Sequence, residues 1–223
     1  MIVKLLSIIL KVFFYRLPAP LFSAEEVKAF SRIYETAVST HTEIVIESSF
    51  VKSRFIQYVC ATREVVVHGS NHSGIDEFIP KRQTLFDGKY VNAVFATKDA
   101  VWGIFYAVFD RRKLVGSFRN ACLKLREDDS SYYFFSLTPN TLDKKPWTTG
   151  TIYFLPQKYF DRSKKGIVSF DEWTSQVAVK PLTQLQVGPQ DFGFLKSISW
   201  HKPSENIIKS WLLYKYRIPQ TRR

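Results

Sequence analysis

The chain has 223 residues, of which 45% are hydrophobic and 16% aromatic, and it carries a formal net charge of +12. This much apolar material can build a substantial core, so an intrinsically disordered body is excluded. The charge is uneven, because residues 140–223 hold 14 Lys/Arg against 6 Asp/Glu, whereas residues 1–139 hold 18 against 14. A basic half favours polyanions, namely nucleic acid, a membrane surface or a phosphate-rich ligand, although a solvated surface that aids solubility explains the same charge.

The first 14 residues resemble a signal peptide only superficially, because Lys11 interrupts the apolar run and no good cleavage site follows. Their apolar residues recur at helical spacing, and the segment is too short to span a bilayer. The sequence therefore predicts an amphipathic helix packed on the domain. Attachment to a membrane surface through residues 1–14 is the less favoured alternative.

Further helices and strands follow in chain order. Ser23 and Glu26 form the Ser-x-x-Glu pattern of a capping box, which opens a predicted helix that runs to about Val38. A second helix is predicted over residues 50–61, and a third over 100–109. Strands are predicted over residues 64–68, where Gly69 makes a turn, and over 91–96, 132–137, 151–155, 176–179 and 185–187, with a C-terminal helix over 204–216.

Helices first, and then strands split by one helix, predict an α+β fold with a mainly antiparallel β core. We expect one domain, 1–223, with an N-terminal helical part (1–62), a core (63–200) and a basic C-terminal helix and tail (201–223). The two cysteines, Cys60 and Cys122, are expected in the core. They form no disulfide framework, which fits a cytoplasmic protein.

The central stretch holds the main chemical signal. His68, Gly69 and Ser70 follow a short β-branched run, and glycine lets another group approach the backbone closely. Such a pair can bind a ribose hydroxyl through the imidazole and a carboxamide through the glycine backbone. The plainer interpretation is a histidine at a strand end that bonds a carbonyl, with glycine only making the turn.

About 25 residues later, Phe95, Ala96 and Thr97 end a strand, and a helix with Trp102 and Phe105 follows. Together with His68-Gly69-Ser70, this resembles the core of the ADP-ribosyltransferase superfamily, most of all the rifamycin-modifying enzymes. The chain as a whole also resembles a widespread bacterial family, through short sequence motifs such as Phe78–Thr84, Arg119–Cys122 and Trp147–Pro156. The resemblance implies an ADP-ribosyltransferase type of β core and NAD as a substrate.

The resemblance also implies roles for these residues. His68 would hold an NAD ribose, Gly69 the nicotinamide amide, and Ser70 the same end of the site. Phe95 and Phe105 correspond to aromatic rings around nicotinamide, and Ala96, Thr97 and Trp102 would line the same place. The alternative for the aromatic residues is ordinary core packing.

Transferases of this class usually carry a glutamate on a late strand that stabilises the oxocarbenium-like transition state. Gln176 occupies that place on the predicted late strand, and glutamine carries no charge to stabilise a cation. Glu172, four residues earlier, is the alternative carboxylate, or else an exposed loop residue. Rifamycin-modifying enzymes do not rely on the usual glutamate.

Arg82, in the loop after His68, would face a pyrophosphate, or else be an exposed loop residue. We expect no metal, because His68 and His72 lie four apart in a glycine-containing stretch without a nearby carboxylate. The expected function is NAD-dependent transfer of ADP-ribose to an unknown acceptor, such as a nucleic acid or a phosphorylated molecule. The alternative is a non-catalytic module that binds nucleotide or nucleic acid on a degenerate transferase fold.

Overall fold

The computed structural model describes residues 2–47, 49–84, 90–126, 128–162 and 166–218. Its α-helices are α1 (Ile2–Phe13), α2 (Ala24–Thr40), α3 (Lys52–Thr62), α4 (Ala100–Val108), α5 (Pro139–Asp143) and α6 (Ile207–Leu213). Its strands are β1 (Tyr15–Leu17), β2 (Val65–Ser70), β3 (Lys81–Thr84), β4 (Tyr90–Ala96), β5 (Phe118–Leu125), β6 (Asp128–Leu137), β7 (Gly150–Pro156), β8 (Asp161–Arg162), β9 (Val168–Phe170), β10 (Trp173–Ser175), β11 (Thr183–Val187) and β12 (Ser199–Trp200).

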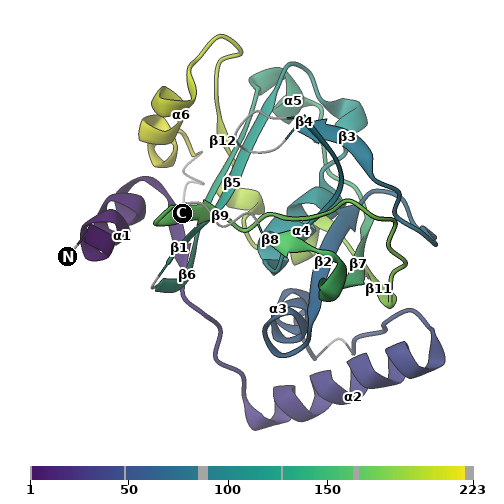
Figure 1. The fold of residues 1–223 in the computed structure, drawn as a ribbon. Helices are drawn as coiled ribbons and strands as arrows, with labels where there is room; N and C mark the ends of the chain where they lie inside the picture. The colour runs from purple at the N-terminus through teal and green to yellow at the C-terminus, as the bar shows by residue number, and fades with distance from the viewer. Residues whose placement is uncertain (1, 48, 85–89, 127, 163–165, 219–223) are drawn as a thin grey trace.

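Three small sheets form the β structure, as Figure 1 shows. One has the order β1-β6-β5-β9, with β12 also pairing with β6; the others are β3-β4-β10-β8 and β11-β7-β2. All the named strand pairs are antiparallel apart from β12 with β6. The predicted α+β class with mainly antiparallel strands is therefore confirmed.

Helix α4 lies at the centre of the molecule, between the β11-β7-β2 sheet and the long strand β6. Its sequence is apolar on every side, as expected for a helix enclosed by other elements. Asp99 caps its first turn by accepting the backbone N–H of Trp102 at 3.0 Å. Eight of its nine residues are buried, and Tyr106 is the exception.

The N-terminal predictions hold closely. Ser23 and Glu26 form the expected capping box at the start of α2. Helix α3 matches the helix predicted over 50–61, with its ends shifted by one or two residues. Cys60 and Cys122 are both buried and unpaired, as expected for core residues. Helix α1 packs on the domain through Leu10, which is buried.

Other predictions need correction. Strand β2 continues through Gly69 and Ser70 and does not turn there, because both residues pair with β7. The strand predicted over 176–179 lies earlier, at β10, and β5 was not predicted at all. No helix among the described residues is long and apolar enough to cross a membrane.

Candidate active site

His68 is anchored to the neighbouring strand. Its Nδ1 lies 2.6 Å from the backbone carbonyl oxygen of Phe95, and its ring packs on Phe78 with centroids 4.7 Å apart. A carbonyl can only accept, so Nδ1 donates and Nε2 of the neutral ring is left as an acceptor. Burial lowers the pKa of His68, the Phe95 carbonyl opposes this shift, and the charge of Arg111 lowers the pKa further. The imidazole is therefore neutral, and the plainer prediction of a histidine bonded to a carbonyl is confirmed.

Gly69 lies on β2 at the point where the neighbouring strand β4 ends. Val67 exchanges two backbone hydrogen bonds with Thr97, of 2.7 and 2.9 Å, and β4 ends there. Because backbone groups alternate along a strand, the N–H and C=O of Gly69 also point away from β7, past the end of β4. A peptide group in this position can bind a planar amide of a ligand.

A side chain at position 69 would have no room. A Cβ atom there would lie 2.1 Å from the carbonyl oxygen of Gly103 and 2.7 Å from the backbone nitrogen of Ala107, both in α4. The helix thus packs directly against the strand at Gly69. Close approach, and not a turn, explains the glycine.

His68 and Phe95 point to opposite faces of the sheet. Val67 and Thr97 pair with each other, and their methyl groups both approach Gly103, so their side chains face α4. Side chains alternate along a strand, which places Phe95 on the α4 face and the His68 ring on the other. The structure therefore brings His68 to the backbone of Phe95 and not to its ring.

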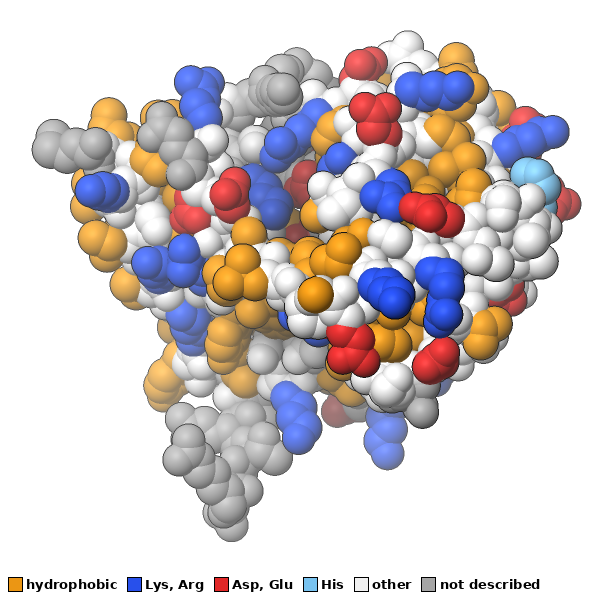
Figure 2. Space-filling model, turned by 90° about the horizontal axis from the view of Figure 1, so that it is seen from below, with side chains coloured by type: hydrophobic (Ala, Val, Ile, Leu, Met, Phe, Trp, Pro, Cys, Tyr) orange, Lys and Arg blue, Asp and Glu red, His pale blue; other side chains and the backbone are white. Residues whose placement is uncertain are grey.

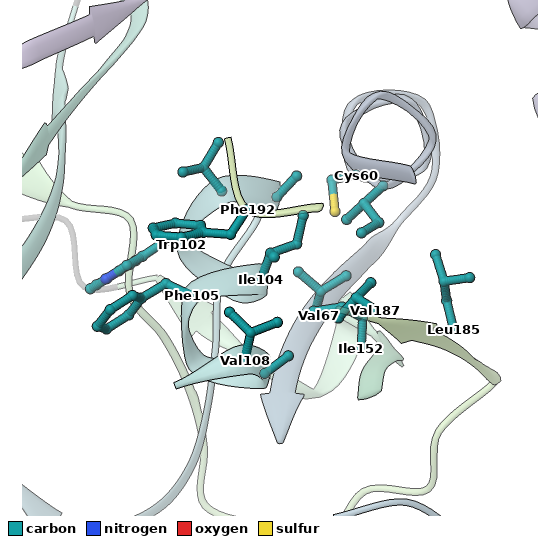
Figure 3. Close-up of a cluster of buried hydrophobic side chains, with 14 of the residues drawn as sticks. Cys60, Val67, Trp102, Ile104, Phe105, Val108, Ile152, Leu185, Val187 and Phe192 are labelled. Carbon is teal, nitrogen blue, oxygen red and sulfur yellow. The ribbon is translucent and has the colours of Figure 1, made fainter. Parts of the chain in front are cut away.

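Phe105 belongs to the core and not to a ligand site. It is fully buried, with its ring 4.8 Å from that of Phe135 and stacked on Phe109 at 5.4 Å. Figure 3 shows it on the side of α4 near Trp102, within the buried cluster. The prediction that its ring lines a nicotinamide site is contradicted, because no part of the side chain is accessible.

Tyr106, and not Phe105, is the aromatic residue of α4 that is partly exposed. Trp102 and Tyr106 lie one turn apart on α4, and both donate to Oδ1 of Asn120, at 2.5 and 3.1 Å. The guanidinium of Arg111 lies 5.2 Å from the centre of the Tyr106 ring. Tyr106 is the one residue of α4 that is not buried, so its side chain can contact a ligand, whereas that of Phe105 cannot. Its spacing of four from Trp102 was the signal in the sequence.

Glu172 supplies a buried carboxylate. It is 8% exposed, directly precedes β10, and its charge helps to raise the pKa of Tyr106. Burial is the main cause of that shift, and the charge of Arg111 and the hydrogen bond with Asn120 oppose it. The alternative that Glu172 is an exposed loop residue is contradicted.

Gln176 does not lie on a strand. Strand β10 ends at Ser175, and Gln176 is exposed in the bend that follows. The prediction that it occupies the late strand is wrong, because the hydrogen bonds with β4 end one residue earlier. Of the two candidates, only Glu172 is buried.

The remaining predicted residues lie around these groups. Ser70 accepts the backbone N–H of His72 at 3.1 Å, and Ala96 is buried. Thr97 is also buried and donates to Asp171 at 3.2 Å. Arg82 is exposed on β3, with its guanidinium 4.6 Å from the centre of the Tyr90 ring, so it is not in the loop where the sequence put it.

A polar cavity of about 400 Å³ opens beside the first turn of α4. Its lining includes the buried carboxylates Asp99 and Asp171 and the cations Lys124 and Arg162. Asp99 accepts from Ser131 and Tyr133 at 2.8 and 2.6 Å, which accounts for its burial. Burial raises the pKa of Asp171, against the charge of Lys124.

His68, Gly69 and Tyr106 do not line this cavity, so it is a separate feature. No group of three or more metal-ligating side chains occurs among residues 2–47, 49–84, 90–126, 128–162 and 166–218.

No family model matches the chain, and neither a curated protein nor a solved structure does.

Proposed function

We propose that the chain is an NAD-dependent ADP-ribosyltransferase-like enzyme. The observation that carries the proposal is a carboxylate, Glu172, buried directly before β10, together with Tyr106, the one residue of α4 that is not buried. The same helix packs on Gly69, whose backbone points past the end of β4. A carboxylate, an aromatic ring and an open peptide edge are the groups that nicotinamide riboside chemistry needs.

Each group has a distinct role in this proposal. The peptide of Gly69 binds the carboxamide of nicotinamide, and the ring of Tyr106 lies beside the nicotinamide ring. Glu172 accepts a hydrogen bond from the ribose 2′-hydroxyl and stabilises positive charge at C1′. The bond between C1′ and the nicotinamide nitrogen breaks, its electron pair stays with nicotinamide, and an acceptor that gives up a proton bonds to C1′.

His68 has a positioning role at the ribose end. Its Nδ1 is held by Phe95, so the accepting Nε2 is the atom available to a ribose hydroxyl. The excess of basic residues after residue 139 makes a nucleic acid or a phosphorylated molecule the favoured acceptor.

A second candidate is a non-catalytic module that binds nucleotide or nucleic acid on the same fold. Position 176, which the sequence pattern matches to the usual glutamate of the superfamily, holds an uncharged glutamine that lies exposed after β10, and this favours the non-catalytic module. The two candidates differ in whether NAD is consumed.

Release of free nicotinamide from labelled NAD, with and without RNA as acceptor, tests the proposal. We expect Glu172→Gln to lower the rate by about 100-fold or more, since it removes charge stabilisation with little change of shape. His68→Ala is expected to weaken NAD binding. Gln176→Ala is the matched control and keeps the wild-type rate, because Gln176 lies outside the site.

NAD binding, measured by calorimetry, separates the candidates. Binding without turnover, and with no effect of Glu172→Gln, supports the non-catalytic module. Absence of NAD binding in the wild-type protein contradicts the enzyme proposal.

A further inference from the structure

Helix α1 leaves a broad apolar face uncovered. Leu10 is buried and Val3, Leu6 and Phe13 pack on the core beside it. Five other aliphatic side chains are 42–61% exposed, and at 100° per residue they span an arc of about 120°; they are Ile2, Leu5, Ile8, Ile9 and Val12. A soluble surface helix normally carries polar residues in such an arc.

Helix α6 extends the same apolar surface. It packs beside α1, with the ring of Trp211 5.8 Å from that of Phe14, and both helices lie at the left of Figure 1. Its Ile207, Ile208 and Leu212 are 40–60% exposed. Exposed apolar side chains thus gather on two adjoining helices, and together they form the α1–α6 face.

The charge around the α1–α6 face is positive. Helix α1 contains Lys4 and Lys11 and no acidic residue, and both lysines are exposed. Lys209 and Lys215 are exposed on the side of α6. In Figure 2, Lys and Arg side chains alternate with hydrophobic ones at the left edge of the molecule, where α1 lies in Figure 1.

Carboxylates close to the two helices are already paired. Asp128, whose partner Tyr132 bonds Ser7 of α1, lies 3.6 Å from Arg16. Glu205, just before α6, makes two hydrogen bonds of 2.7 and 2.9 Å with Arg217. These pairs leave the exposed lysines as the unbalanced charges of the face.

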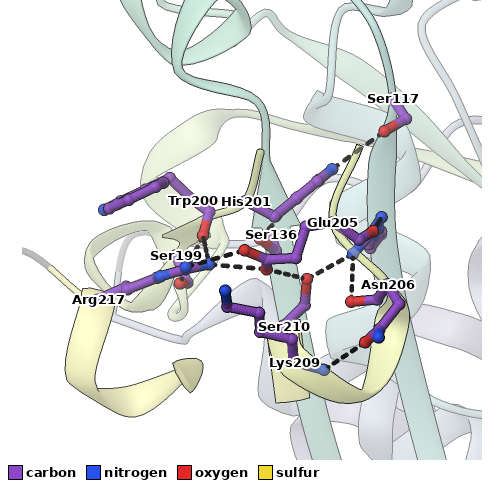
Figure 4. Close-up of polar contacts among 11 residues, drawn as sticks. Ser117, Ser136, Ser199, Trp200, His201, Glu205, Asn206, Lys209, Ser210 and Arg217 are labelled. Carbon is purple, nitrogen blue, oxygen red and sulfur yellow. Dashed lines mark hydrogen bonds and ion pairs between the residues drawn. The ribbon is translucent and has the colours of Figure 1, made fainter. Parts of the chain in front are cut away.

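Hydrogen bonds hold the two helices of the α1–α6 face in place. Figure 4 shows Glu205 between Arg217 and Ser210, with Ser210 donating to it at 2.7 Å. Arg119 of β5 bonds the backbone oxygen of Asn206 at the start of α6 at 3.2 Å. Lys215 donates to the backbone oxygen of Lys11 at 2.6 Å, which ties the end of α1 to the end of α6. The exposed apolar residues therefore project from ordered helices.

We propose that the α1–α6 face docks the protein on the surface of an anionic lipid bilayer. Aliphatic side chains in one arc with lysines at its edge, on a helix too short to span, fit a helix that lies in the interface plane. The lysines attract acidic headgroups, while the aliphatic side chains enter the outer acyl region. A protein partner would also bury the apolar arc, but the exposed lysines favour a surface of dense negative charge.

Flotation with lipid vesicles tests this proposal on the full chain. We expect binding to phosphatidylcholine vesicles that contain about 30% phosphatidylserine, weaker binding in high salt, and little binding to pure phosphatidylcholine. Leu5→Gln with Val12→Gln should lower the bound-to-free ratio by about 10-fold or more, because two apolar anchors are lost. Lys4→Gln with Lys11→Gln should weaken binding to the acidic vesicles alone.

The matched control is Leu21→Gln with Val45→Gln. These two side chains are also highly exposed, at 89% and 81%, but lie outside the face, so this variant should bind like the wild type. All variants should unfold at the wild-type temperature, since every substituted side chain is exposed.

Equal binding of the α1 variant and the wild type would overturn the proposal, as would no vesicle binding at all. A stable dimer in light scattering that Leu5→Gln with Val12→Gln dissociates would also overturn it, because a second copy would then cover the face.

Discussion

At the scale of single residues, Gly69 is a position where the backbone of α4 leaves no room for a side chain. Alanine would place its Cβ 2.1 Å from a carbonyl oxygen of α4, and backbone cannot give way as a flexible side chain can. We expect Gly69→Ala to destabilise the protein by about 3 kcal/mol, since α4 must move away from β2. Urea unfolding measures the change.

Gly193→Ala is the control for this prediction. A Cβ atom there meets nothing within 4 Å, and its backbone is not in the left-handed region. Its free energy of unfolding should stay within about 1 kcal/mol of the wild type. Equal effects of the two substitutions would contradict the packing argument.

The neighbours Phe105 and Tyr106 show what single residues reveal in a sequence. Both are aromatic on an apolar helix, and a superfamily pattern pointed to Phe105. A helix that is enclosed on nearly every side shows no polar stripe, so hydrophobic periodicity cannot tell which residue faces out. Only the placement of β6 on one side and β2 on the other decides it.

At the scale of elements, helix α2 tests how far residues that are close in the sequence determine where a helix begins. The hydroxyl of Ser23 accepts the backbone N–H of Glu26 at 3.1 Å, and the Glu26 carboxylate accepts the N–H of Ser23 at 2.9 Å. We expect Ser23→Ala to lower the free energy of unfolding by about 1 kcal/mol, because the first turn loses its cap. Thermal or urea unfolding gives the value.

Ser23→Asp should recover most of this loss, since aspartate also accepts at the cap. If alanine and aspartate at position 23 destabilised the protein equally, the cap would not be the cause. The sequence predicted this helix within two residues because its start signal is local.

Strand β10 is the contrasting element. Its three residues are defined by pairing with β4 and β8, which are distant in the chain. Nothing in the local pattern separates Trp173–Ser175 from the β-branched run after it. The prediction therefore placed the strand too late and put Gln176 in the place of the carboxylate.

At the scale of the whole molecule, stability should depend on pH through a buried histidine. His201 is fully buried between Ser117 and Ser136, at 3.0 and 2.8 Å from their hydroxyl oxygens. Burial lowers the pKa of His201 to about 4, the charges of Arg119 and Arg217 act in the same direction, and Glu205 opposes them. In the unfolded chain the pKa is about 6.5.

The lowered pKa means that the folded state prefers neutral His201. Its contribution is fully present above about pH 6.5 and is lost as the pH falls towards 4, by roughly 3 kcal/mol in total. The partly buried His68, whose pKa is also lowered, adds to the same trend. Unfolding by urea between pH 7 and 5 should show falling stability, before the carboxylates with lowered pKa begin to titrate.

Two variants test whether His201 causes this pH dependence of the stability. His201→Gln should flatten the dependence between pH 6.5 and 5, whereas His72→Gln, at an exposed position, should leave it unchanged. The assignment is contradicted if His201→Gln keeps the full slope.

The sequence by itself determined what depends on near neighbours: the α+β class, the capped helix α2 and the buried cysteines. Tertiary structure alone decided which residues meet from distant parts of the chain. It left Tyr106, and not Phe105, partly exposed on α4, and it buried Glu172 directly before β10. It also left half of α1 uncovered, because the burial of an apolar face depends on what packs against it, and periodicity does not specify that.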